Sequence, residues 1–516
     1  MKDKVIHPFL FAAYPILTLL AVNIEETKAT SALRSLGLTL LITGFLALLL
    51  WLWLHDWQKA AMVLTLGILL FFSYGHVYNY LELQTNSGFS LGRHRYLLPL
   101  WAAIFGLGAW GIFRLDKNRR LINPALNWIA VMALIFPLFR LASYSWRSSK
   151  VDNLQAVQAG AAQDLSLPSN QPAPDIYYII LDAYSRDDTL KELFGYDNSH
   201  FLRRLEELGF FIARCSRSNY AQTQLSLASS LNYNYLDALG DQYVAGSTTR
   251  VGIEELIHHS AIRRGLESLG YTVVAFETGF KGTQWEDADL YLAPRAGSLE
   301  TMQVLGGISN FELMLLRTSA GLVIEDGTLV LPRFFQPDFD HPDRVHRERI
   351  LYVFDQLQGL PALPGPKFVF AHLVIPHPPY VFGPHGEYVA QDKEDMPGYT
   401  DQITYLNQVM VLLLQILISA SSTPPVIIVQ GDHGAINAPP GQRMNILNAY
   451  YLPNTDRGLL YDRITPVNSF RIVLNAYFGT QLPLLEDRSL FSIYKQPYEY
   501  TIIQDSRPGC SQSRSE

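Results

Sequence analysis

The stretch DIYYIILDAY, residues 175–184, decides how the larger part of this chain folds. Its middle is an unbroken apolar run, which is the pattern of a β-strand buried on both faces of a sheet. Three similar runs follow, and helical patterns such as His200–Gly209 and Thr400–Ala420 alternate with them. This alternation predicts a mostly parallel sheet with helices on both faces, a three-layer α/β/α domain. The three further runs are Tyr271–Thr278, Lys367–Ile375 and Pro425–Gly431.

Each of the four expected strands ends in residues that can bind a metal or carry a proton. Because the carboxyl ends of parallel strands meet at one edge of a sheet, binding sites form there. We therefore expect one site at this edge. The strands lead, in chain order, to Asp182, to Glu277, to His372 and His377, and to the pair Asp432–His433.

The stretch QGDHGA, Gln430–Ala435, is the sharpest local motif. It holds Asp432 and His433 side by side between two glycines, just past a buried strand. A carboxylate and an imidazole suit a divalent metal such as zinc or manganese, and the alternative is a solvated polar turn. Asp182 would supply a second carboxylate, unless it only caps the turn after its strand.

A nucleophile candidate lies in SNYAQTQLSLASSLN, Ser218–Asn232, where Thr223 precedes a helical pattern. The amino terminus of a helix presents unpaired N–H groups that favour a phosphate. A metal on the hydroxyl oxygen would make Thr223 a nucleophile, whereas the alternative is a plain helix cap. Ser226, Ser229 and Ser230 are weaker candidates because they lie further into the helix.

The stretch AHLVIPHPPYVFGPHG, Ala371–Gly386, contains three histidines and four prolines. Prolines on both sides of His377 predict a rigid loop that holds its imidazole in place. His377 would then bind a phosphate oxygen or transfer protons. His372 has the alternative of a buried core histidine, and His385 that of a surface residue.

The first 147 residues contain five apolar stretches, each close to the roughly 20 residues that cross a bilayer as helix. We reject a signal peptide for two reasons. No small-residue cleavage site follows the first apolar stretch, and four further apolar stretches come after it. The sequence therefore predicts a transmembrane domain over 1–147, a polar linker over 148–174 and a catalytic domain over 175–516. The five stretches are Val5–Val22, Ser35–Leu54, Ala60–Leu81, Tyr96–Leu115 and Leu121–Tyr144.

Charge gives an orientation for the membrane domain. Basic residues between the fourth and fifth stretches, with Lys2 and Lys4, favour a cytoplasmic amino terminus and a catalytic domain on the outer side of the cell membrane. Arg93, Arg95, Arg147 and Lys150 count against it. The basic residues between the stretches are Arg114, Lys117, Arg119 and Arg120.

Composition excludes three other classes of protein. The formal net charge of −7 provides no basic surface for nucleic acid. Two cysteines, Cys215 and Cys510, are too few for a disulfide scaffold or a zinc-thiolate site. Whether these two form a single bridge stays open.

The motifs LDAYSR, YAQTQLSLASSLN, GYTVVAFETG, HLVIPHPPY and GDHGA, taken in order, resemble the sulfatase-like branch of the alkaline phosphatase superfamily. The similarity spans most of residues 175–484 and is greatest to lipoteichoic acid synthases and phosphoethanolamine transferases, which are membrane-anchored. It implies an alkaline phosphatase-like domain with one divalent ion, zinc or manganese, or else magnesium or calcium. It also implies that Asp182, Thr223, Asp432 and His433 bind this ion, that Thr223 is the nucleophile and that His377 contacts the head group.

This resemblance implies transfer of a head group, such as phosphoglycerol or phosphoethanolamine, from a phospholipid to a glycan or lipid acceptor of the cell envelope. The reaction would pass through a phospho-threonine. Thr223 cannot become the formylglycine of sulfatases, which disfavours sulfate ester hydrolysis, and Asp182 stands where lipoteichoic acid synthases carry Glu. The alternatives are a phosphodiesterase, a phosphatase or another sulfatase-like hydrolase, and a non-catalytic membrane scaffold.

Overall fold

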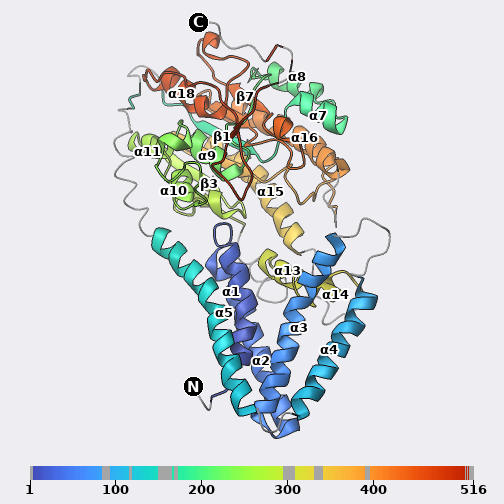
Figure 1. The fold of residues 1–516 in the computed structure, drawn as a ribbon. Helices are drawn as coiled ribbons and strands as arrows, with labels where there is room; N and C mark the ends of the chain where they lie inside the picture. The colour runs from blue at the N-terminus through green and yellow to red at the C-terminus, as the bar shows by residue number, and fades with distance from the viewer. Residues whose placement is uncertain are drawn as a thin grey trace. The chain divides into compact units, whose positions relative to one another are not determined.

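The chain forms two compact units in the computed structural model (Figure 1). The first unit combines Met1–Arg147 with Glu300–Pro342, and the second combines Ser148–Leu299 with Asp343–Glu516. Most of the linker expected over 148–174 lies outside the described residues. The structure describes residues 4–83, 93–114, 119–148, 165–167, 172–294, 308–329, 341–389, 396–505, 507 and 509–510.

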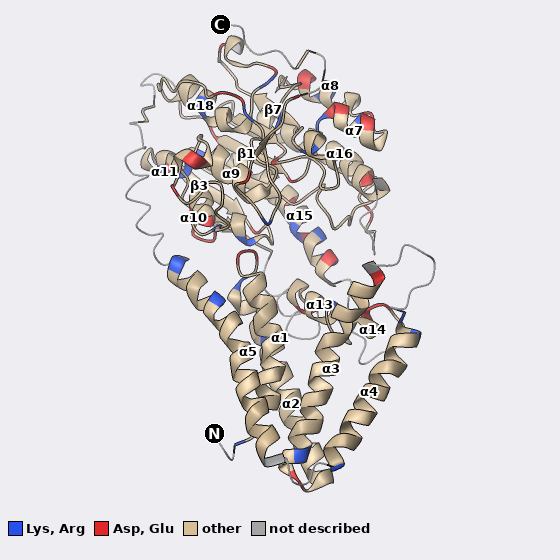
Figure 2. Cartoon of the chain, in the orientation of Figure 1, with Lys and Arg blue, Asp and Glu red and all other residues tan. Residues whose placement is uncertain are grey.

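The first unit contains the five expected apolar helices. Four of them are long and apolar enough to cross a membrane, and α1 is a shorter apolar helix of 16 residues. Charged side chains are sparse along these helices (Figure 2). Large apolar side chains such as Leu41 and Phe139 are exposed, as contact with lipid requires. The helices are α1 (His7–Val22), α2 (Leu33–Leu54), α3 (Trp57–Leu83), α4 (His94–Arg114) and α5 (Arg119–Ser148).

A segment from the middle of the chain packs on these helices. It contains α13 (Asn310–Arg317) and α14 (Leu322–Glu325). Arg34 forms an ion pair with Glu312, and His94 forms one with Asp326. The N–H of Ala320 donates to the carbonyl of Phe71 over 2.8 Å. The helical unit is therefore built from two separate parts of the sequence.

The second unit contains a seven-stranded sheet in the order β2-β7-β6-β1-β5-β3-β4. The five strands from β6 to β4 are parallel, whereas β7 and β2 each pair antiparallel with their neighbour. The mostly parallel sheet predicted from the sequence is thus confirmed. The strands are β1 (Ile176–Leu181), β2 (Phe211–Ile212), β3 (Thr272–Phe276), β4 (Leu290–Leu292), β5 (Lys367–Leu373), β6 (Val426–Gln430) and β7 (Asn448–Tyr451).

Strand β1 lies in the middle of the sheet and faces a hydrophobic core on both sides. The side chains of Ile176, Tyr178 and Ile180 contact one core. The side chains between and after them contact the other core, on the opposite face of the sheet. This is why the strand sequence is apolar without interruption. Helices α9 (Thr223–Leu231), α10 (Ile253–His258), α11 (Ala261–Ser268) and α18 (Pro466–Tyr477) cover the first face, and α7 (Asp187–Phe194), α8 (Ser199–Glu207), α15 (His341–Gly359) and α16 (Met396–Ala420) cover the second.

Helix α16 is long and apolar enough to cross a membrane, judged by its length and composition. Its side chains Ile403, Met410 and Leu414 are nevertheless buried in the core of the sheet domain. We therefore assign α16 to the α/β/α domain, as the sequence predicted. The remaining short elements are η1 (Ala29–Ala32), η4 (Leu236–Ala238), η5 (Lys281–Thr283), η7 (Leu360–Ala362), α17 (Pro440–Arg443), η8 (Arg457–Leu459), β8 (Leu490–Phe491) and β9 (Thr501–Ile502).

Cys215 and Cys510 form a disulfide bond, which the sequence alone left open. The bond joins the residues after β2 to the end of the chain. Asp505 strengthens this attachment by pairing with the buried Arg186 over 2.8 Å. Disulfides persist in oxidising compartments, so the bond bears on where this domain is located.

Candidate active site

The central strands of the sheet bring the predicted site residues together. Strands β6, β1 and β5 are direct neighbours, and Asp432, Asp182 and His377 follow their carboxyl ends. The loops are also joined to one another, because the N–H of His377 donates to the carbonyl of Asp182 over 3.1 Å. Parallel strands place three parts of the chain, far apart in sequence, at one edge of the sheet.

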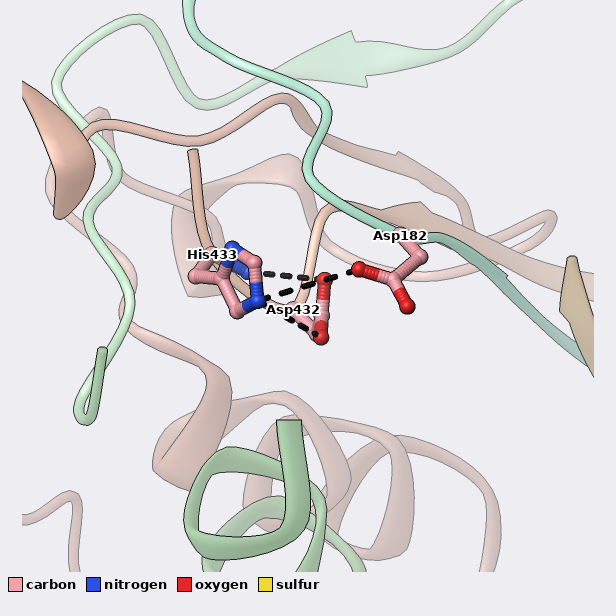
Figure 3. Close-up of side chains that lie close together, drawn as sticks. All are labelled: Asp182, Asp432 and His433. Carbon is pink, nitrogen blue, oxygen red and sulfur yellow. Dashed lines mark hydrogen bonds and ion pairs between the residues drawn. The ribbon is translucent and has the colours of Figure 1, made fainter. Parts of the chain in front are cut away.

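Asp182, Asp432 and His433 form a compact group of buried side chains (Figure 3). One ligand atom from each residue lies within 4.8 Å of the others. Nε2 of His433 is 3.7 Å from Oδ1 of Asp182 and 3.6 Å from Oδ2 of Asp432. Two carboxylate oxygens and one imidazole nitrogen therefore face a common point.

The chemistry of this group fits a divalent cation. Oδ1 of Asp182 and Oδ2 of Asp432 are buried and have no hydrogen-bond partner among the described residues. Two unpaired buried carboxylate oxygens are costly unless a cation offsets them. Nδ1 of His433 donates to the carbonyl of Gly434 over 2.8 Å, so Nε2 of the neutral ring carries a lone pair for a metal.

The local backbone explains how the DHG sequence holds this arrangement. Oδ1 of Asp432 accepts from the N–H of Ala183 over 3.0 Å and from the N–H of His433 over 2.9 Å, which leaves Oδ2 for a ligand. Gly431 passes close to the loop that follows β1, since a Cβ there would lie 2.5 Å from the carbonyl oxygen of Tyr184. A side chain at Gly431 would push this turn away from the site.

Thr223 lies where the sequence predicted, at the first residue of α9. Its hydroxyl oxygen is 3.4 Å from Nε2 of His433, and its side chain is half-buried. The buried Ser226 hydroxyl donates to the carbonyl of Asp432 over 2.8 Å and so joins the helix to the metal-binding loop. The hydroxyls of Ser229 and Ser230 bond to Asn234 and Leu227 instead, so Thr223 is the one at the site.

Histidines surround the Asp182 carboxylate. Nε2 of the buried His372 lies 3.3 Å from Oδ2 of Asp182, and Nδ1 of His372 contacts the hydroxyl of Thr283 over 2.9 Å. Burial alone would raise the pKa of the Asp182 carboxyl. The charge of His377, the contact with His372 and the charge of His433 outweigh burial and hold this pKa below its ordinary range.

Two of the residues singled out from the sequence do not join this group. Glu277 follows β3, but its Oε1 accepts from Nε of Arg349 over 3.0 Å. His385 is exposed, and its backbone N–H donates to Glu387. The prediction that all four strands contribute to the site is thus met by three of them.

Arg443 is a residue that no sequence motif singles out. Its Nε donates to the carbonyl of Ala221 over 3.1 Å, and its Nη1 donates to that of Ile436 over 2.9 Å. Nη2 has no acceptor in the part of the chain that is described. Burial lowers the pKa of Arg443, and the nearby charges of Asp432 and Asp182 oppose this change. No motif marks Arg443, because its position depends on two loops folding together.

His346 on α15 is a second residue that the sequence did not reveal. Burial lowers the pKa of His346 to about 3, and the charges of Arg349 and His377 act in the same direction. Its Nε2 is buried without a partner among the described residues. His346 is therefore neutral at ordinary pH.

The sequence matches no protein-family model and no curated protein. The structure is similar to several solved structures. The C-terminal periplasmic domain of EptC from Escherichia coli shares 11% identity over 68% of this chain and 98% of that chain, with a TM-score of 0.43.

Two further solved structures are similar to this chain. The lipooligosaccharide phosphoethanolamine transferase EptA from Neisseria meningitidis, an integral membrane protein, shares 13% identity over 90% of this chain and 94% of that chain, with a TM-score of 0.39. The lipoteichoic acid synthase LtaP from Listeria monocytogenes shares 12% identity over 68% and 82%, with a TM-score of 0.37. At such low identities and TM-scores, the chemistry of this chain has to be argued from its own side chains.

Proposed function

We propose that this protein is a metal-dependent transferase that moves a phosphoryl-alcohol head group from a phospholipid to an acceptor of the cell envelope. The observation that carries the proposal is the position of the Thr223 hydroxyl, 3.4 Å from a buried metal-ligand set. A hydroxyl at a helix amino terminus beside a cation is suited to attack phosphorus. The acceptor in this proposal is a glycan or a lipid.

Asp182, Asp432 and His433 would hold the cation, with the Thr223 oxygen beside them. One imidazole nitrogen and carboxylate oxygens suit zinc or manganese, and magnesium or calcium are further candidates. A divalent ion at this point would lower the pKa of a nearby hydroxyl and offset the charge of the phosphate. Such an ion would also offset the repulsion between the two buried carboxylates.

In the first step, Oγ1 of Thr223 forms a bond to phosphorus while the bond from phosphorus to the diacylglycerol oxygen breaks. The Thr223 proton passes to solvent, and the departing oxygen takes up a proton from solvent. The head group remains on Thr223 as a phosphate ester. The first turn of α9 directs its N–H groups at this phosphate.

In the second step, the acceptor hydroxyl attacks the same phosphorus and the bond to Thr223 breaks. His377 takes the acceptor proton at Nε2, because its Nδ1 donates to the carbonyl of Pro378 and Nε2 of the neutral ring then carries a lone pair. The Thr223 oxygen regains a proton from solvent and His377 releases one. The chain then returns to its initial state.

Arg443 would stabilise the phosphate charge in both steps. Two backbone carbonyls fix its guanidinium, and Nη2 remains to donate to a phosphate oxygen. A charge placed in advance at a partly buried position acts strongly on a developing negative charge. Burial lowers the pKa of Arg443, whereas the negative charges of Asp432 and Asp182 oppose this change.

A phospholipid donor accounts for the apolar helices, because an enzyme anchored in the membrane reaches its lipid substrate by lateral diffusion in the membrane plane. The Cys215–Cys510 bond supports a location outside the cytoplasm, where disulfides persist. The proposed location is therefore the cell membrane, with the catalytic domain on the outer side. A hydrolase would use the same first step, and water would take the place of the acceptor hydroxyl in the second step.

The test uses the full-length protein in detergent with phosphatidylglycerol or phosphatidylethanolamine that carries a fluorescent acyl chain. We expect wild type to release fluorescent diacylglycerol, Thr223→Ser to retain part of this activity and Thr223→Ala to lose it. Equal rates for wild type and Thr223→Ala would refute the nucleophile assignment. Adding a glycan acceptor separates transfer from hydrolysis, since only a transferase moves the head group onto the glycan.

A further inference from the structure

The two residues that flank Thr223 are glutamines, and both bond to one arginine. Nη1 of Arg250 donates to Oε1 of Gln224 over 3.3 Å, and Nη2 of Arg250 donates to Oε1 of Gln222. Arg250 is buried, as is Gln224. The guanidinium thus bonds to the residue on either side of Thr223.

Arg250 and Gln222 are in turn fixed by the segment after β8. Nη2 of Arg250 also donates to the carbonyl of Tyr494 over 3.1 Å, and its guanidinium lies 4.3 Å above the ring of that tyrosine. Nε2 of Gln222 donates to the hydroxyl of Ser492 over 3.0 Å. Contacts on both ends of the Gln222 amide hold this side chain in one orientation.

Gln222 occupies the position that precedes the first turn of α9, yet its side chain makes no cap hydrogen bond to the helix. Most residues chosen for this position place a side-chain oxygen on the first N–H groups. Here Arg250 and Ser492 bond to the two ends of the Gln222 amide instead. The Gln222 side chain therefore does not cap the amino end of α9.

We propose that Arg250 is a positioning residue that holds Gln222 and Gln224, and through them fixes the Thr223 hydroxyl beside His433. This inference rests on the proposed function and deepens it. An arginine suits the task because its planar fork bonds two acceptors at once, which a lysine ammonium does with less geometric control. A nucleophile displaced by about 1 Å loses on the order of 100-fold in rate.

The molecule offers a matched control in Arg471 on α18. Arg471 is buried to the same degree, bonds to the carbonyls of Tyr233 and Pro483 over 2.8 Å and 2.7 Å, and lies over the ring of Tyr233. Tyr233 follows the carboxyl end of α9, so Arg471 supports the opposite end of the same helix. Removing Arg471 should destabilise the domain without displacing Thr223.

The experiment measures single-turnover formation of the Thr223 adduct in the full-length protein, by peptide mass, with fluorescent phosphatidylglycerol and phosphatidylethanolamine as probes. We expect Arg250→Met to slow adduct formation about 10- to 100-fold. Arg250→Lys should recover only part of the rate, and KM should change less than about twofold. Arg471→Met should form the adduct at a rate within about twofold of wild type.

A second arm tests whether Arg250 acts through the glutamines. Gln222→Met alone should slow formation of the Thr223 adduct. The double variant Gln222→Met/Arg250→Met should be little slower than Arg250→Met alone, because the two residues act as one unit. Bound metal per chain should be unchanged in all of these variants. An Arg250→Met rate equal to that of Arg471→Met, or fully additive effects, would overturn the inference. Absence of any Thr223 adduct in wild type would instead overturn the proposed function, and this inference with it.

Discussion

The hydroxyl oxygen of Thr223 lies 3.4 Å from Nε2 of His433, although 210 residues separate the two along the chain. The contact joins the amino end of α9 to the loop that follows β6. It places the proposed nucleophile against the proposed metal ligands.

Asp432→Asn should abolish tight metal binding while the domain stays folded. The amide oxygen can keep the bonds from Ala183 and His433, but the buried side chain loses the charge that a cation requires. We expect metal affinity to fall by more than about 100-fold, beyond the loss typical of supporting residues. The measurement is metal per chain after dialysis.

Thermal unfolding provides the control for this variant. A chelator should lower the thermal midpoint of wild type, because a bound ion stabilises the folded state, and should leave Asp432→Asn unaffected. Equal metal content in the two proteins would contradict the proposed site.

Arg443→Met should reduce kcat by roughly 100- to 1,000-fold, as expected for loss of a fixed donor to a developing charge. Arg443→Lys should reduce it less, because it keeps the charge but not both carbonyl bonds. Steady-state release of fluorescent diacylglycerol measures this. Metal content should stay at the wild-type level, and a change in kcat below about threefold would show that Arg443 serves only to hold the loops.

Cys215→Ser should lower the free energy of unfolding by about 2–4 kcal/mol, because the bond to Cys510 closes a long loop and restricts the unfolded chain. The thermal midpoint should fall with it, by roughly 2–4 °C per kcal/mol. A reductant should reproduce the shift in wild type and have no further effect on the variant. The same midpoint for both proteins under oxidising conditions would contradict this.

His259 should stabilise the catalytic domain in a pH-dependent way. The hydrogen bond to Glu255 raises the pKa of His259, and the negative charge of Glu255 adds to this increase. Asp287 raises the same pKa through its own hydrogen bond and charge. Because this pKa is higher in the folded state than in the unfolded state, His259 contributes its full stabilisation below about pH 6.5. That contribution to the free energy of unfolding is lost as the pH rises through the folded-state pKa. Because these side chains are partly exposed, the gain should stay below about 1 kcal/mol.

The comparison is the unfolding free energy of wild type and His259→Gln at pH 5.5 and pH 8.5. The difference should be larger at pH 5.5 and should shrink in high salt, which screens exposed pairs. His385→Gln is the control, because the exposed His385 side chain has no ion pair among the described residues. A larger difference at pH 8.5 would reverse the predicted sign.

Several features of the sheet could be read from local sequence because they depend on local physics. A strand buried on both faces must be apolar throughout, and DIYYIILDAY supplies β1 with alternate residues for two cores. The order of strands was not readable: nothing in the sequence says that β6 and β5 lie on either side of β1. Strand order depends on long-range pairing that leaves no local pattern.

By itself, the sequence determined the apolar helices, the alternating α/β pattern and the residue types that gather at the sheet edge, Asp182, Thr223, Asp432 and His433 among them. Only the tertiary structure decided that Glu277 bonds to Arg349, that Arg443 bonds to the carbonyl of Ala221, that Arg250 bonds to Gln224, and that Cys215 reaches Cys510. The reason is physical. Periodicity and motif are fixed by neighbours along the chain, whereas the partner of a buried charge is fixed by which distant segments fold against it.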